Sequence, residues 1–358
     1  MNSQEHTSAA TTAPPRNLAP RPAPTLLSIV IPVYNEQESL PHLRQSLESL
    51  ATQLPCPVEW ILVNDGSRDQ TRHLLLAWAR TDDRLHVVDF ARNFGHQAAL
   101  TAGLDHAAGD AVAVMDADLQ DPPELILDML TRYCEGYDIA YAQRTRRHGE
   151  TFFKRATASG FYWLMRKFIH HDLPANTGDF RLMSRDAVNA IRHMREGQRF
   201  LRGMITWIGF AQIAVPFERP PRVAGETKFS AHKMLAFAWD AIISFSSAPL
   251  QVAMTFGTLV FFFGLGYAGY AFFRAMMYGD LVPGWATLVI LQCLIGGSIL
   301  LCLGIIGEYI GRIYEEIKGR PIYIVRELVN FTASPAARTE FEPPRAVKSM
   351  AHRHGENR

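Results

Sequence analysis

Short apolar runs alternate with amphipathic segments from about residue 26 onward. The apolar runs are rich in Val, Ile and Leu, as buried parallel strands are, and they lie at 27–33, 58–64, 85–90 and 111–115. Helices are expected around them at 38–51, 74–80 and 97–108. Repeated strand–helix units predict an α/β protein with a doubly wound sheet. In such sheets ligands bind where the carboxyl ends of the strands meet.

Long apolar runs in the last third of the chain break this alternation. They span residues 249–273 and 286–308, and each is long enough to cross a hydrocarbon core of about 30 Å at about 1.5 Å per residue. We therefore expect a hairpin of two transmembrane helices, the alternative being a hairpin buried in a soluble core. Basic residues flank the hairpin on its outer sides, at Arg219, Arg222, Lys228 and Lys233 and again at Arg312, Lys318, Arg320 and Arg326. The positive-inside rule then places the large N-terminal domain and both termini in the cytoplasm.

The remaining boundaries follow from composition. Segment 152–170 interleaves aromatic and basic residues, which favours a helix lying in the membrane interface over an ordinary surface helix packed on the sheet. Polar, Pro-rich and Ala-rich stretches are expected to be disordered tails at 1–24 and 333–358. The other expected units are a catalytic domain at 25–230, a juxtamembrane amphipathic helix at 231–248 and a cytoplasmic C-terminal segment at 311–332.

Charge and cysteine content exclude several classes of protein. The formal net charge is +1, so no broad electrostatic field attracts nucleic acid. The four cysteines form no Cys-x-x-Cys pair, which argues against a zinc site or a disulfide framework. Reduced thiols in a cytosol-facing protein fit this spacing better.

Polar clusters follow three of the expected strands, and they read PVYNE from Pro32, NDGS from Asn64 and DADLQ from Asp116. Two carboxylates spaced as in Asp116 and Asp118 can converge on one hard cation, and Gln120 adds a nearby oxygen. The sequence thus predicts a site for Mg²⁺ or Mn²⁺. Taken singly, these residues also fit plain β-turns and helix N-caps. Their recurrence at successive strand ends favours one shared site.

These clusters are part of a larger set of motifs. Together with RNFGHQAALTAG from Arg92 and the extended DADLQDPPE from Asp116, they resemble the family 2 glycosyltransferases of the GT-A fold. GDFRLMSR from Gly178, RFLRG from Arg199 and RVAGETKFS from Arg222 are similar to the polyprenyl-phosphate sugar transferases, the relatives of dolichol-phosphate mannose synthase.

The C-terminal stretch GIIGEYIGRIYEEIKGRPIYIV, from Gly304, resembles the bacterial undecaprenyl-phosphate glucosyltransferases with two membrane spans. The resemblance covers about residues 26–330. It implies a GT-A doubly wound mixed sheet, interfacial helices and a transmembrane hairpin in the bacterial inner membrane. It also implies a homotetramer.

The resemblance gives each matching residue an expected role. The nucleotide-sugar donor would be bound by Pro32, Tyr34, Asn35, Glu36, Asp65, Asp116, Ala117, Asp118, Arg222 and Lys228. The divalent cation would be held by Asp118, Gln120 and Asp116, and the acceptor phosphate by Arg144, Arg155 and Ser159. The catalytic set would be Asp116, Asp118 and Asp179, with Asp179 contacting the acceptor or sugar hydroxyls or else orienting Arg181.

The implied reaction is inverting transfer of a sugar to a polyprenyl phosphate for modification of cell-envelope glycans. The lipid phosphate is already anionic, so the protein has to align it and stabilise the leaving diphosphate. UDP-glucose is the expected donor, with GDP-mannose or a UDP-linked aminosugar as alternatives. A processive polysaccharide synthase and a non-catalytic membrane adaptor are competing hypotheses for the whole chain. The Gln-x-x-Arg-Trp motif of such synthases is absent, since Gln198 and Arg202 are four apart and no Trp follows.

Overall fold

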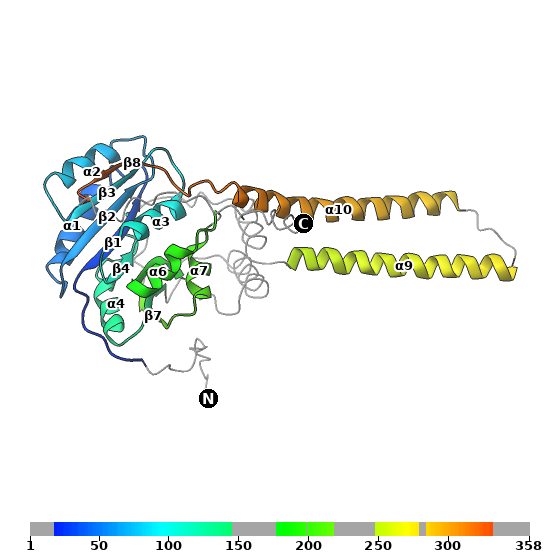
Figure 1. Cartoon of the computed structure of the whole chain (residues 1–358), viewed down its shortest axis with the longest axis horizontal. Coiled ribbons are helices and arrows are strands. Elements are labelled where there is room, and N and C mark those ends of the chain that lie inside the picture. The colour runs from blue at the N-terminus through cyan, green and yellow to red at the C-terminus, as the bar shows by residue number, and fades with distance from the viewer. Residues whose placement is uncertain (1–17, 145–176, 198, 218–247, 279–283, 332–358) are drawn as a thin grey trace, which may run out of the picture.

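The computed structural model describes residues 18–144, 177–197, 199–217, 248–278 and 284–331. These parts form an α/β unit built on one sheet and a long helical hairpin that projects from it (Figure 1). The interfacial helix expected at 152–170 lies outside the described residues. So do almost all of the juxtamembrane helix expected at 231–248 and the tail at 333–358.

One sheet of eight strands organises the described part of the α/β unit. Its parallel centre consists of β1 (Leu27–Val33), β2 (Val58–Asn64), β3 (Leu85–Phe90) and β4 (Ala111–Val114). The outer strands are β5 (Ile139–Arg144), β6 (Thr177–Ser184), β7 (Gln212–Phe217) and β8 (Val325–Val329). The order is β7-β5-β6-β4-β1-β2-β3-β8, with β6 antiparallel to both of its neighbours. This mixed sheet confirms the predicted fold class.

Helices cover both faces of the sheet (Figure 1). One face carries α1 (Leu40–Ala51), α2 (Thr71–Ala79) and α4 (Leu125–Cys134). The other carries α3 (His96–His106), α6 (Arg185–His193) and α7 (Leu201–Trp207). Each layer closes its own apolar core against the central strands, as a doubly wound fold requires.

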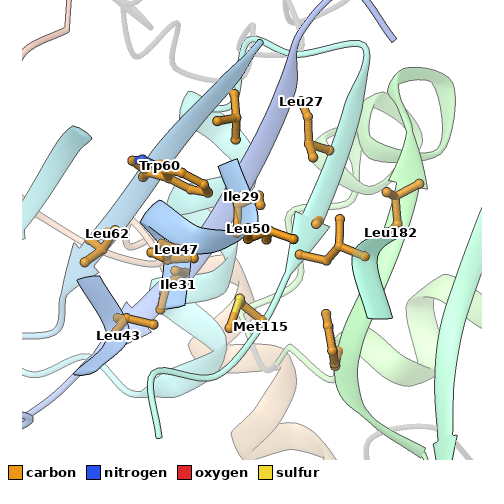
Figure 2. Packing of buried hydrophobic residues seen from close by; sticks show 14 of the residues in the cluster. Leu27, Ile29, Ile31, Leu43, Leu47, Leu50, Trp60, Leu62, Met115 and Leu182 are labelled. Atoms are coloured by element: carbon orange, nitrogen blue, oxygen red, sulfur yellow. The ribbon is translucent and has the colours of Figure 1, made fainter. Parts of the chain in front are cut away.

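Strand β1 shows why the central strands are apolar throughout. Ile29 and Ile31 point to the face covered by α1, where they pack with Leu43 and Leu47 (Figure 2). The neighbouring Val30 belongs to the core on the opposite face, under α3. A Cβ at Gly103 of α3 would overlap the Val30 side chain. The small residues of α3 therefore let this helix lie very close to the strand whose end forms the site.

The predicted membrane hairpin consists of α9 (Ala248–Tyr278) and α10 (Trp285–Ile317), which run side by side (Figure 1). Within them, Val252–Arg274 and Leu294–Ile317 are long and apolar enough to cross a membrane and are almost entirely exposed. Helix α10 continues to Ile317, past the expected end of its span at 308. Exposed apolar side chains on such long helices indicate a lipid environment.

The chain after α10 returns to the sheet, where β8 pairs antiparallel with β3. Arg72 links the two strands, since it bonds Asp89 at 2.8 Å and Glu327 at 2.7 Å. Just before β8, the ring of Tyr323 stacks on Phe90 with centroids 5.2 Å apart. The segment after α10 therefore completes the sheet of its own chain.

The N-terminal boundary differs from expectation. Residues 18–24, assigned to a disordered tail, lie along the unit, and the Arg21 guanidinium bonds Gly136 O at 2.7 Å and Asp138 Oδ1 at 2.8 Å. The same guanidinium lies over the Tyr133 ring at 4.6 Å. The composition of this stretch, rich in Pro and Ala, gave no sign of the attachment, because contacts with residues far along the chain leave no local sequence pattern.

Candidate active site

The carboxyl ends of β1, β2 and β4 open into one cleft of about 380 Å³. All three predicted polar clusters reach it, together with the loop that precedes α3. The lining consists of Pro32, Val33, Tyr34, Glu36, Asp65, Asn93, Gly95, His96, Ala99, Asp116, Ala117 and Asp118. The structure thus brings together most of the residues that were predicted to bind a nucleotide-sugar.

Asn35 is not among the described residues that line the cleft. It lies in the turn after β1 with a φ of 53°, a left-handed conformation that Asn tolerates. Its Oδ1 accepts a hydrogen bond from the Arg68 backbone N–H at 2.8 Å, and its own N–H donates to Ser67 Oγ at 3.0 Å. Asn35 therefore joins the turns after β1 and β2, and its predicted contact with the donor stays a prediction.

Asp65, at the end of β2, is buried and fixes the loop before α3. Its carboxylate accepts hydrogen bonds from the backbone N–H of Phe94 at 2.6 Å and of Gly95 at 3.0 Å, and from Asn93 Nδ2 at 3.0 Å. Burial raises the pKa of Asp65, although these amide donors act in the opposite direction. The predicted role of Asp65 in binding the donor stays a prediction. What the geometry shows is a carboxylate that sets the position of His96.

Asp116 and Asp118 lie in the cleft just beyond the end of β4. Burial raises the pKa of Asp116, and the nearby carboxylates Asp179 and Asp118 raise it further. A divalent cation would relieve this crowding of negative charge, so the two residues fit one. The described residues contain no group of three or more His, Cys, Asp or Glu side chains placed to hold a metal. Substrate phosphates and water commonly supply further ligands at Mg²⁺ sites.

Gln120 lies against Asp118 rather than apart from it. Its backbone N–H donates to Asp118 Oδ1 at 3.2 Å, and its side-chain amide donates to Asp118 Oδ2. In this arrangement Gln120 orients a predicted metal ligand. Its own predicted role as a ligand would need the amide oxygen turned toward the cation.

Asp179, on β6, is buried and surrounded by basic side chains. Its Oδ1 accepts a hydrogen bond from Arg202 Nε at 2.7 Å, and its Oδ2 lies 3.2 Å from His96 Nε2. The Arg181 guanidinium is also close, with Nη2 3.9 Å from Oδ1. Burial alone would raise the pKa of Asp179, but the bonds from His96 and Arg202 hold it well below the ordinary range of a carboxyl. Asp179 is therefore an anion fixed on both oxygens.

Arg144, at the end of β5, is the predicted acceptor residue that the structure describes. Its Nη2 lies 3.3 Å from Asp121 Oδ2, in the loop that carries Asp118. A Cβ on Gly178 would lie 3.5 Å from the same nitrogen, so Arg144 borders the segment that leads into Asp179. Its Nε is buried and has no hydrogen-bond partner among the described residues. The other residues predicted for the acceptor and the diphosphate, Arg155, Ser159, Arg222 and Lys228, lie outside the described residues.

His96 lines the cleft and Arg202 holds Asp179, and neither was predicted from the sequence. Both lie inside motifs that carried the resemblance, but neither motif was given a role for its basic residue. Their function depends on Asp179, which is far from both in the sequence, so spacing alone gave no signal. The available signal was that basic residues occur in the motifs expected to lie near the strand-end carboxylates, which is typical of functional sites.

Comparison with known proteins decides the family. Residues 28–192 match the family described as Glycosyl transferase family 2. The glycosyltransferase YkcC of Bacillus subtilis is 46% identical over 300 residues, which cover 84% of this chain and 93% of that protein. The chain belongs to glycosyl transferase family 2. This membership confirms the resemblance in the sequence, and the mixed sheet is the GT-A fold.

Other members of the family share the hairpin as well. Residues 248–313 match the GtrB C-terminal hairpin. The SfII prophage-derived bactoprenol glucosyl transferase of Shigella flexneri is 38% identical over 84% of this chain and 97% of its own length. The prophage bactoprenol glucosyl transferase homolog of Escherichia coli is 37% identical over 84% of this chain and 99% of its own length. The hairpin match and the two apolar helices make this member a membrane-associated glycosyltransferase.

Proposed function

We propose that this protein transfers glucose from UDP-glucose to a polyprenyl phosphate, undecaprenyl phosphate in a bacterium, with inversion at the anomeric carbon. The observation that carries the proposal is the match to relatives named bactoprenol glucosyl transferase. They are 38–39% identical and are covered over 97–98% of their length, through catalytic domain and hairpin alike. The glucosylated lipid would supply cell-envelope glycan modification.

The donor would lie in the cleft at the ends of β1, β2 and β4. Tyr34 is 42% exposed there, and its ring would stack on the base. Asp116 and Asp118 would hold Mg²⁺ or Mn²⁺, which when bound would neutralise the charge of the departing diphosphate. Arg222 and Lys228 would add positive charge at the diphosphate.

The acceptor would enter on the side of Arg144 and Asp179. The Arg144 side chain is 28% exposed, and its guanidinium suits a phosphate, since arginine recognises phosphate through several N–H donors. Arg155 and Ser159 would complete the phosphate site. With the phosphate already anionic, Asp179 need not remove a proton, and we assign it to the sugar or acceptor hydroxyls.

The hairpin would place this chemistry at the cytoplasmic face of the inner membrane. The short connection between the two helices contains few charges, whereas basic residues flank the outer ends. Both termini and the catalytic sheet would then lie on the cytoplasmic side. We further propose that the protein assembles as a homotetramer, as the resemblance implies. Crosslinking in intact membranes would test this, and a purely monomeric product would exclude it.

A donor screen tests the function. Purified full-length protein is incubated with undecaprenyl phosphate, Mn²⁺ and one radiolabelled sugar donor at a time: UDP-glucose, UDP-galactose, a UDP-aminosugar or GDP-mannose. The expected product is a single organic-extractable lipid carrying one β-linked glucose, formed from UDP-glucose alone.

Each competing function gives a different result. If the lipid carries label from another donor, the assigned sugar is wrong but the proposed reaction type is retained. A polymer that grows without lipid phosphate would indicate a processive synthase. If no donor supports transfer, the result would favour the non-catalytic membrane adaptor.

A further inference from the structure

His96 lines the cleft, but no role was predicted for it. Its Nε2 lies 3.2 Å from Asp179 Oδ2 and 3.7 Å from Asp116 Oδ1. The three residues come from the start of α3, from β6 and from the end of β4. One ring nitrogen therefore stands between the carboxylate assigned to the cation and the carboxylate assigned to the sugar or acceptor hydroxyls.

The two oxygens of Asp179 are held by different side chains. Arg202 Nε donates to Oδ1 at 2.7 Å, so that contact fixes one end of the carboxylate. The other oxygen, Oδ2, is held by the His96 ring, and rotation about the Cβ–Cγ bond is restrained only while both contacts persist. Without His96, Asp179 Oδ2 would also face the Asp116 carboxylate without an intervening donor, and like charges repel.

The position of His96 is itself fixed from the nucleotide side of the cleft. The backbone N–H groups of Phe94 and Gly95, immediately before it, donate to Asp65. Gly95 has a φ of 100°, which turns the chain into α3. A continuous path of contacts therefore runs from Asp65 through this loop to His96 and on to Asp179.

We propose that His96 is a positioning residue that sets the orientation of Asp179 relative to Asp116, and so aligns the acceptor side with the donor cleft. The inference rests on the proposed transfer reaction. The hydrogen-bond partner of the His96 ring is Asp179, which is assigned to the sugar or acceptor hydroxyls and not to the nucleotide. Loss of its hydrogen bond should therefore reduce kcat far more than it changes the KM for the donor.

Three variants separate hydrogen bonding from ring size. His96→Phe keeps a ring and has no donor, His96→Ala removes both, and His96→Gln keeps an N–H donor on a different frame. His106→Ala is the matched control, because His106 ends the same helix and bonds Ala102 O away from the cleft. All are assayed as full-length protein with whichever donor the wild type uses, and their unfolding temperatures are compared.

We expect kcat to fall about 100-fold in His96→Phe and His96→Ala, with the donor KM within about threefold of wild type. His96→Gln should recover about tenfold of that loss, and His106→Ala should keep wild-type kcat. The side chain of His96 is 45% exposed, so all three should fold. A wild-type kcat in His96→Phe would overturn the proposal. A kcat of His96→Gln no higher than that of His96→Phe would overturn it as well.

A change confined to the donor KM would also overturn the proposal, because it would make His96 a donor-binding residue. Failure of UDP-glucose in the wild type would refute only the assigned sugar. The His96 comparison would then proceed with the donor that is accepted.

Discussion

Gly66 offers the sharpest test of how the cleft is built. It lies in the turn after β2 with a φ of 64°, in the left-handed region that favours glycine. A Cβ added there would lie 2.5 Å from Asn93 N and 2.9 Å from Arg92 Cα, both backbone atoms. The turn thus packs directly against the loop that positions His96, and Gly66→Ala would push these two segments apart.

Gly209 is a control with a similar backbone conformation and open space where a Cβ would be added. Its φ is 69°, and a Cβ there would meet nothing within 4 Å among the described residues. Each substitution should cost about 1–2 kcal/mol for the left-handed backbone, and Gly66→Ala should cost about 1–3 kcal/mol more for the overlap. For a domain of this size, that excess corresponds to an unfolding temperature lower by roughly 2–12 °C.

The measurement is thermal unfolding of the full-length variants in the same detergent, followed by intrinsic tryptophan fluorescence. Donor binding is measured on the same preparations by titration calorimetry. We expect Gly66→Ala to unfold earlier than Gly209→Ala and to bind the donor more weakly, because the displaced loop lines the cleft. Equal unfolding temperatures and equal affinities would refute the close packing of the two turns.

Further predictions concern the cation, the C-terminal attachment and pH. Asp118→Ala should lower turnover by at least about 100-fold, and chelation of the cation in the wild type should do the same. Membrane insertion, measured by carbonate extraction, should stay intact. Activity that survives both treatments would contradict the proposed metal site. Tyr323→Phe keeps the stacking on Phe90 but loses the 2.8 Å hydrogen bond to Asp105. The free energy of unfolding should fall by about 1–2 kcal/mol, and proteolysis after α10 should become faster. An unchanged cleavage rate would contradict this. Since the pKa of Asp179 is held below its unfolded value, its stabilising contribution is present above about pH 4 and is lost as the pH falls further. Between about pH 2 and pH 4, the free energy of unfolding should therefore fall less steeply with decreasing pH in Asp179→Asn than in the wild type, and equal slopes would be evidence against this.

The sequence predicted the parallel centre of the fold well because local signals dominate there. Strands β1, β2 and β3 lie at the predicted residues, since each is a continuous apolar run buried on both faces. The three polar clusters were correctly expected to meet, because parallel strands put their carboxyl ends on one edge.

What the sequence could not supply depends on contacts between distant segments. The short run VRELV of β8 alternates weakly, and its place beside β3 is set by pairing with a strand more than two hundred residues earlier. The same holds for His96 and Arg202, whose importance arises from convergence on Asp179. The attachment of the segment around Arg21 gave no sequence signal, because its backbone and side-chain bonds go to residues 134–138, more than a hundred residues away, and leave no local pattern.

The strand after α10 has a mechanical consequence. Only residues 318–324 separate the end of that helix from β8, so Ile317 and Val325 can be no more than about 29 Å apart even with the chain fully extended. The Gly197 N–H also donates to Glu316 Oε2 at 2.9 Å, which holds the helix end against the loop after α6. The sheet therefore cannot move far from the end of the apolar helix α10, and this short connection limits the distance between the cleft and any membrane that α10 enters.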